Sequence, residues 1–123
     1  MLRLLMIVSG GIEALFGVSA ILATPMLVSA LGTEAGTSAL FFARMLGAAT
    51  LGIGIAALLA RNELAGPGGL AVAYGLALYN VLAAVLILWT AAEAGGAALW
   101  GTGILHAVIG TLFVSALARR VPN

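Results

Sequence analysis

The sequence contains no cysteine and no lysine, and charged residues make up only 7% of its 123 positions. Without cysteine the chain can form no disulfide bond and offers no thiolate chemistry. Soluble domains carry about 25% charged residues, so this chain has too few charged side chains to cover a surface that faces water. Its net charge of +1 provides no basic patch for nucleic acid. The scarcity of charge therefore excludes an ordinary soluble domain and a nucleic-acid-binding module.

Hydrophobic residues are abundant instead: they make up 63% of the chain, and its mean hydropathy is +1.23. A transmembrane helix needs about 20 apolar residues, so the length allows four such helices and no separate soluble domain. The apolar segments are too long for strands and lack alternation with a period of two residues. We therefore expect a single all-α domain over residues 1–123, an antiparallel bundle of four transmembrane helices. They are expected at residues 2–23, 38–60, 69–92 and 97–118.

Proline and glycine mark the connections between these helices. Pro25 lacks a backbone N–H group and is expected to end the first helix, with a short interfacial helix over residues 26–32. The glycine- and proline-rich run at residues 66–69 predicts the loop before the third helix. The chain also starts with an arginine ahead of an apolar run, as a signal peptide does. Because Glu13 lies inside that run, we interpret it as a retained first helix.

The arginines predict how the helices are oriented. A four-helix chain places its two termini and its second connection on the same side of the membrane. Four of the five arginines fall in these regions: Arg3, Arg61, Arg119 and Arg120. The first and third connections carry Glu34 and Glu93 and no basic residue. Since cytoplasmic loops are enriched in arginine and lysine, we expect both termini to be cytoplasmic.

Glycine recurs at intervals of seven residues in each expected helix, which predicts how the helices pack. The pairs are Gly10 and Gly17, Gly47 and Gly54, Gly68 and Gly75, and Gly103 and Gly110. Seven residues are about two helical turns, so both members of a pair lie on one face. Small residues let helix backbones approach closely in lipid, and left-handed crossing is the common result. We therefore expect a left-handed bundle whose helices meet along these glycines.

Four polar residues stand near the middle of the apolar segments, one in each expected helix: Glu13, Arg44, Asn80 and His106. Glu13, Arg44 and His106 each lie three residues from a glycine of the packing faces, so we expect them to point into the bundle. Ionisable side chains inside a membrane are costly and usually pair with one another. We therefore predict an ion pair between Glu13 and Arg44, within a buried cluster that Asn80 and His106 complete.

The composition of this cluster limits its chemistry. One histidine and one glutamate are too few ligands for a metal site, and a single histidine leaves no second axial ligand for a haem within one chain, so we expect neither a metal nor a cofactor. A His–Glu pair can transfer protons, but no residue is specified as a nucleophile and no substrate is indicated. The sequence thus favours a binding or structural protein over an enzyme.

The chain resembles the DoxX-like superfamily of small four-helix bacterial membrane proteins. The residues that carry the resemblance are the runs 44–47 and 51–54, the pair Tyr79–Asn80, His106 within residues 105–107, and the exit from the first helix at Pro25. The resemblance implies a multi-pass protein of the bacterial inner (plasma) membrane. It also implies an accessory role beside a quinone-coupled membrane oxidoreductase, and not catalysis by this chain. The candidate binding site consists of the four polar residues Glu13, Arg44, Asn80 and His106 together with Tyr79.

The dimensions of the chain are also similar to those of the small multidrug resistance transporters, which have four helices and a glutamate in the first helix. Glu13 can match that glutamate, but Arg44 as its fixed partner would compete with a cationic drug. Three hypotheses follow: a bundle that binds a small lipophilic molecule such as a quinone or lipid, a proton-coupled transporter that uses Glu13 and His106, and a purely structural membrane subunit. The sequence leaves open whether the chain forms homo-oligomers.

Overall fold

The computed structural model of the protein describes residues 1–32 and 36–120, and every regular element in these two ranges is a helix. The five helices are α1 (Leu2–Leu22), α2 (Thr24–Ala30), α3 (Thr37–Ala60), α4 (Pro67–Ala94) and α5 (Ala97–Ala118). The four longer ones are long and apolar enough to cross a membrane. They begin and end within two residues of the expected bounds. The prediction of an all-helical chain with four helices long and apolar enough to span a membrane is confirmed.

The break after α1 occurs where the sequence predicts it, although the helix that follows begins earlier than expected. Helix α1 ends at Leu22, and α2 begins at Thr24, so that Pro25 lies in its first turn. Proline is tolerated there because the first turn of a helix leaves its N–H groups without intrahelical partners. The connection from α2 to α3 lies mostly outside the described residues.

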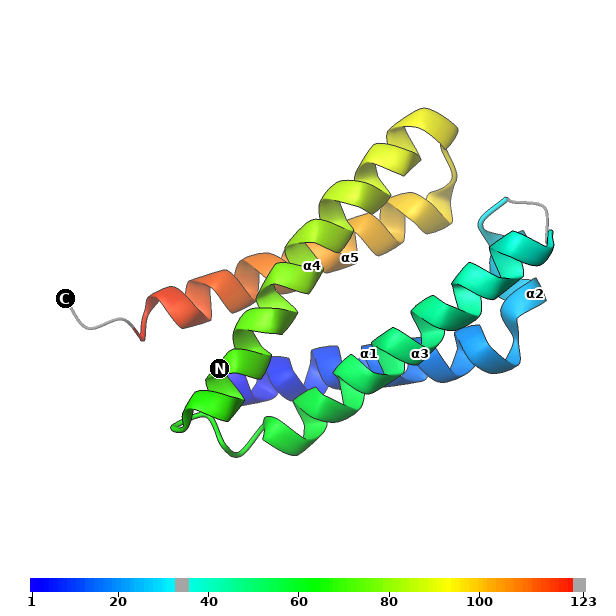
Figure 1. Ribbon diagram of the computed structural model, residues 1–123. Coiled ribbons are helices and arrows are strands. Elements are labelled where there is room, and N and C mark those ends of the chain that lie inside the picture. Colours follow the sequence, from blue (N-terminus) through cyan, green and yellow to red (C-terminus); the bar gives the residue numbers. More distant parts are fainter. Residues whose placement is uncertain (33–35, 121–123) are drawn as a thin grey trace.

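The four long helices are arranged as two pairs. Helix α1 packs along α3, and α4 packs along α5, whereas few contacts link one pair to the other (Figure 1). The pairs converge at the end that holds Met1, the α3–α4 loop and the end of α5, which we call the narrow end. They diverge toward the end that holds α2 and the α4–α5 turn, the wide end (Figure 1). The two pairs are thus splayed rather than packed along their full length.

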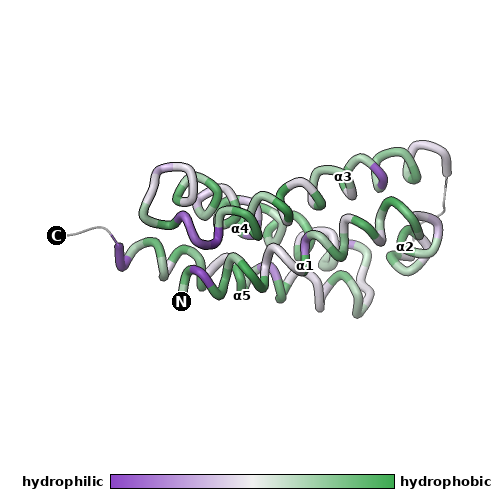
Figure 2. The backbone as a smooth tube through the Cα atoms, turned by 90° about the horizontal axis from the view of Figure 1, so that it is seen from below, coloured by the Kyte–Doolittle hydropathy of each residue, from purple (hydrophilic) through white to green (hydrophobic). Residues whose placement is uncertain are grey.

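The buried core that joins the pairs is confined to the narrow half. It draws on all four long helices: Leu5 and Met6 of α1, Ala57 of α3, Leu76 of α4, and Ile109 and Phe113 of α5. At the narrow end itself, a guanidinium N–H group of Arg120 donates to the carbonyl of Leu64 at 2.8 Å. Figure 2 shows the long helices as mostly hydrophobic, with hydrophilic residues gathered mainly near the two termini. The narrow half therefore holds the molecule together.

Glycine residues allow α1 and α3 to pack closely along a line of contact that we call the α1–α3 seam. A Cβ atom placed on Gly54 would lie 2.5 Å from the backbone nitrogen of Ala14, and one on Gly17 would lie 2.6 Å from the carbonyl oxygen of Gly47. A Cβ atom on Gly10 would in turn lie 3.0 Å from the carbonyl oxygen of Gly54. Gly10 is thus opposite Gly54, and Gly17 is opposite Gly47. The glycine spacing correctly predicts this seam.

The α4–α5 pair uses glycine on one helix only. Gly103 of α5 faces the side chain of Leu88, and Gly110 faces Val81. Around Gly68 and Gly75 of α4, by contrast, a Cβ atom would meet nothing within 4 Å. The prediction that these two glycines mark a packing face is wrong. The turn between the helices needs glycine for another reason, since Gly95 and Gly96 have φ angles of 76° and 97°, which are unfavourable for other residues.

Candidate functional site

Four of the five candidate residues come together in the middle of the molecule, at the edge of the narrow-half core that faces the wide end. They are Glu13 of α1, Tyr79 and Asn80 of α4, and His106 of α5. Glu13, Asn80 and His106 are 2%, 0% and 8% exposed. The glycine spacing placed Glu13 and His106 correctly, because both lie on the packed faces of their helices. Together these four residues form what we call the polar cluster.

Asn80 is the centre of this cluster. Its Nδ2 group donates to the carbonyl of Leu76 at 2.9 Å, one turn back in α4, and to Ser9 Oγ of α1 at 3.5 Å. Because a carbonyl oxygen can only accept, this contact fixes which end of the amide is nitrogen. The Oδ1 atom therefore faces His106, whose Nδ1 lies 2.9 Å away. One side chain thus links α1, α4 and α5.

Tyr79 joins Glu13 to the same group. The Tyr79 hydroxyl donates to Glu13 Oε2 at 3.1 Å. Its ring stands edge-to-face against the His106 ring, with centroids 5.7 Å apart and an interplanar angle of 83°. Aromatic pairs favour this arrangement because the positive edge of one ring meets the negative face of the other. Tyr79 therefore fixes the positions of both ionisable side chains.

Two polar atoms of the cluster have no partner among the described residues: Glu13 Oε1 and His106 Nε2. Within that part of the chain, no buried side-chain nitrogen or oxygen lacks a hydrogen bond. Both atoms must therefore keep some accessible surface, small as the exposure of their residues is. These two atoms give the cluster an unfilled capacity for hydrogen bonding.

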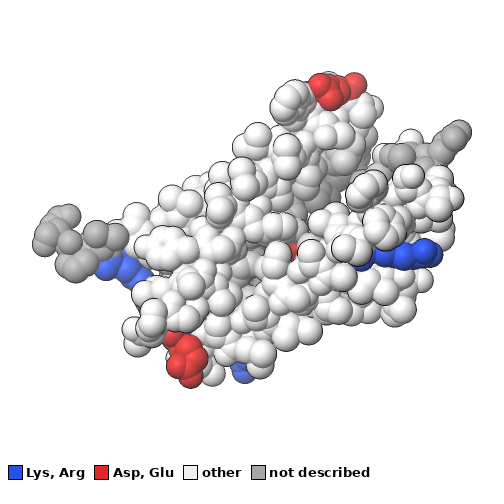
Figure 3. Space-filling view, viewed as in Figure 1, with Lys and Arg blue, Asp and Glu red and all other residues white. Residues whose placement is uncertain are grey.

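The burial of neighbouring turns shows which way the cluster opens. One turn toward the narrow end, the same helix faces are buried, at Ser9, Leu76 and Ile109. One turn toward the wide end, Phe16, Ala83 and Thr102 are partly or fully exposed, while Gly17 and Gly103 stay buried against the partner helix of their own pair. The polar cluster thus lies at the inner end of the space between the diverging pairs, which we call the inter-pair cleft. Figure 3 shows the surface hollowed there, with a trace of acidic surface at the inner end of the hollow.

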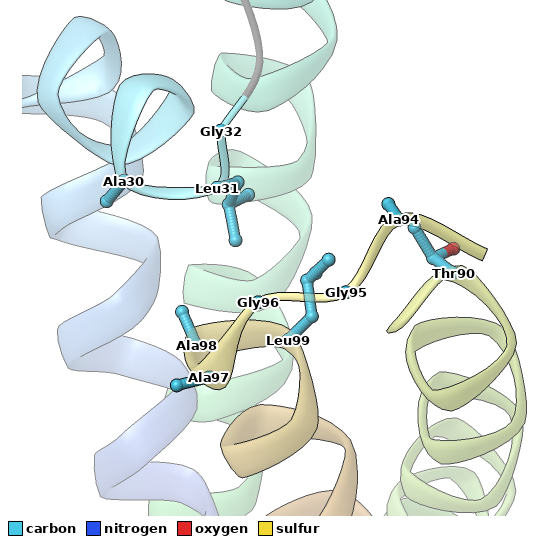
Figure 4. Close-up of a pocket in the computed structure, with 10 residues that line it drawn as sticks. All are labelled: Ala30, Leu31, Gly32, Thr90, Ala94, Gly95, Gly96, Ala97, Ala98 and Leu99. Carbon is cyan, nitrogen blue, oxygen red and sulfur yellow. The ribbon is translucent and has the colours of Figure 1, made fainter. Parts of the chain in front are cut away.

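A pocket of about 410 Å³ lies at the wide end, where the end of α2 approaches the α4–α5 turn. Leu31 and Leu99 face each other across it, and Thr90 borders it from α4 (Figure 4). Its lining is mainly apolar, as suits an acyl or isoprenoid chain. None of the four polar-cluster residues lines this pocket.

Arg44 does not join the polar cluster, so its predicted ion pair with Glu13 is not formed. The α1–α3 seam places Glu13 opposite the stretch midway between Gly47 and Gly54, whereas Arg44 lies about 10 Å farther toward the wide end at about 1.5 Å per residue. Arg44 also points in another direction from α3 than the buried face does. Three residues turn a helix by about 300°, so Arg44 and Thr50 flank Gly47 on opposite sides. Thr50 is buried, and Arg44 is exposed.

Removing Arg44 should therefore leave Glu13 undisturbed. In a double-mutant cycle of Arg44→Met and Glu13→Gln, we expect a coupling energy below about 0.5 kcal/mol, because sites farther apart than about 7–10 Å act independently. Reversible unfolding in mixed micelles measures it. Coupling above about 1 kcal/mol would show that the two side chains interact. The long side chain of Arg44 can instead extend toward the membrane surface.

Sequence reasoning missed Ser9, which accepts the hydrogen bond from Asn80 and is 1% exposed. A signal for it existed, since Ser9 lies one helical turn before Glu13 and therefore on the same face. The buried hydroxyl of Thr50 was also missed, but it donates to the carbonyl of Gly47 at 3.1 Å within its own helix. Thr50 therefore has its hydrogen bond satisfied locally.

Comparisons of the chain with protein-family models, with curated proteins and with solved structures found no match. Assignment of a function therefore depends on the geometry of the polar cluster and the inter-pair cleft.

Proposed function

We propose that the protein is a DoxX-like integral membrane protein that holds a small lipophilic molecule, a quinone or a lipid, in the inter-pair cleft. One observation carries this proposal: a polar cluster with two unpartnered polar atoms lies at the inner end of a cleft with apolar walls. Binding sites for small molecules combine mostly apolar walls with a few polar groups that fix orientation. The ligand would direct its polar end to Glu13 and His106 and its apolar chain toward the wide end.

The arrangement in the membrane is part of the proposal. The helices would form an antiparallel, left-handed bundle in a bacterial inner membrane, with the narrow end and both termini in the cytoplasm. The arginines near the termini and in the α3–α4 loop support this orientation. Because the chain has no cysteine, single cysteines introduced at Asn62 and Glu93 can test it. An impermeant thiol reagent added outside intact cells should label the second position and not the first.

An accessory role fits this site better than catalysis. The polar cluster offers hydrogen bonds and an aromatic wall, and among the described residues no group of three or more histidine, cysteine, aspartate or glutamate side chains could hold a metal ion. Such a protein would store, position or deliver its lipophilic ligand beside an oxidoreductase subunit. The resemblance in Tyr79–Asn80 and His106 supports this role.

Native mass spectrometry of gently extracted protein tests the proposal. We expect a bound lipophile on the wild-type chain. In Ala83→Trp, an indole would occupy the cleft one turn beyond Asn80, and the bound fraction should fall several-fold. In Val85→Trp the same side chain stands about 200° around the helix, where Val85 is 57% exposed, and the ligand should remain. Wild-type protein that carries no lipophile and takes up none from added lipid extract would contradict the proposal.

A proton-coupled transporter is the second candidate, because Glu13 has no cationic partner among the described residues. The argument that Arg44 would compete with a cationic substrate therefore no longer applies. A transporter would show flux of a lipophilic cation into proteoliposomes driven by a pH gradient and abolished by Glu13→Gln. Absence of flux in protein that still binds a lipophile would leave the accessory role.

A further inference from the structure

We infer that the ligand of the inter-pair cleft carries a hydroxyl group at its polar end, as a hydroquinone, a phenol or a lipid alcohol does. This inference rests on the proposed function and narrows its ligand class, since a quinone carbonyl can only accept a hydrogen bond. The hydrogen bonds within the polar cluster determine which of its atoms still have a hydrogen to donate and which have a free lone pair.

The hydrogen bond to Asn80 determines the tautomer of His106. The Nδ2 group of Asn80 donates to the carbonyl of Leu76, so Asn80 Oδ1 faces the imidazole ring at 2.9 Å. An amide oxygen carries no hydrogen, and therefore Nδ1 of His106 must supply one. In a neutral imidazole the other nitrogen then has a lone pair and no hydrogen. His106 thus presents an acceptor, Nε2, to the cleft.

The donor hydrogens of Tyr79 and Asn80 are already used within the protein. The hydrogen of the Tyr79 hydroxyl is used by Glu13 Oε2, and both hydrogens of Asn80 Nδ2 are used by Leu76 and Ser9. Glu13 Oε1 is a further acceptor when the carboxyl group is ionised. A protonated Glu13 would add one donor but would leave Nε2 an acceptor. The hydroxyl of Ser9 keeps its own hydrogen, but Ser9 is 1% exposed and lies one turn toward the narrow end, away from the cleft. The accessible side of the cluster therefore favours a ligand that donates a hydrogen bond.

A carbonyl group in the same place would set its lone pairs against those of Nε2. The ring nitrogen would also lose water without gaining a partner, and leaving a desolvated polar group unpaired is unfavourable. The structure thus predicts discrimination between ligands of the same shape that differ only in a hydroxyl hydrogen. We expect a ratio of dissociation constants of at least about tenfold, which corresponds to about 1.4 kcal/mol.

The test uses the fact that the chain has a single histidine. Nitrogen-15 NMR of protein labelled at histidine, in lipid nanodiscs, reports both ring nitrogens without assignment. The probes are an alkyl hydroquinone, its dimethyl ether and the matching quinone. Because the chain has no cysteine, a reductant can keep the hydroquinone reduced without altering the protein. We expect a ring protonated at Nδ1, a shift of the Nε2 resonance with the hydroquinone, and at least about tenfold weaker binding of the other two probes.

The outcomes separate this inference from the proposed function. Equal binding of all three probes would overturn the inference while supporting a lipophile site. A neutral ring protonated at Nε2, or tighter binding of a lipophilic cation such as tetraphenylphosphonium, would also overturn it. Failure of every probe to bind, together with wild-type protein that extracts without a lipophile, would instead overturn the proposed function.

Discussion

Gly54→Ala should destabilise the protein by about 1–3 kcal/mol, the usual cost of overpacking a well-packed site. The added methyl group would lie 2.5 Å from the backbone nitrogen of Ala14 and 2.7 Å from the carbonyl oxygen of Gly10. Both are backbone atoms, so no side chain can rotate to make room and the two helices must separate. Gly17→Ala should behave in the same way, because its methyl group would meet Leu51 and Gly47 at 2.5 and 2.6 Å.

Matched controls lie in the same helices. At Gly52 of α3 and Gly11 of α1, an added methyl group meets nothing within 4 Å. Alanine is a better helix former than glycine by about 1 kcal/mol, so these substitutions should be neutral or stabilising. Reversible unfolding in mixed micelles would therefore show effects of opposite sign. If Gly54→Ala proved as stable as Gly52→Ala, the close backbone contact between α1 and α3 at this glycine would be contradicted.

Asn80→Leu should cost about 1–3 kcal/mol, since it leaves buried polar groups without partners. The Nδ1 hydrogen of His106 loses its acceptor, and Ser9 loses its donor. The same nitrogen-15 spectrum gives a second readout, because the His106 ring should no longer be held in a single tautomer. Denaturation in detergent measures the first effect and NMR measures the second.

Two further variants show whether this loss comes from the polar cluster. Replacing both partners by apolar side chains removes the orphaned group, so Asn80→Leu with His106→Phe should recover much of the stability lost in the single variant. Thr90→Val removes an exposed hydrogen bond to Leu86 in the same helix and should change stability by less than about 0.5 kcal/mol. A double variant no more stable than Asn80→Leu alone would mean that Asn80 acts in another way.

The helices could be predicted from the sequence because their apolar runs are long and bounded by proline and glycine. The positions of Glu13 and His106 followed from glycine, since Gly10 and Gly103 mark faces on which only small residues permit contact. The exposure of Arg44 could not be predicted in this way. The spacing of Arg44 from Gly47 fixes the angle between the two residues around the helix. Which side of Gly47 is buried, however, depends on where the other helix pair lies.

The splay of the two pairs was also beyond the sequence. In a soluble protein, polar residues mark the outer face of a helix, and their periodicity indicates what is buried. In lipid the surroundings are as apolar as the interior, so Leu86 and Leu76 look alike in the sequence. Yet Leu86 is exposed and Leu76 is buried. Hydropathy thus locates a membrane-spanning segment without showing which side meets protein.

The confinement of the core to the narrow half makes each helix pair a lever whose fulcrum lies at the inner edge of that core, near the middle of the helices. Half of a 24-residue helix such as α3 is about 18 Å long. A rotation of about 5° at the fulcrum would therefore displace the wide end by about 1.6 Å, at about 1.5 Å of rise per residue along the arm. Rotations this small would therefore change the width of the opening between the two pairs.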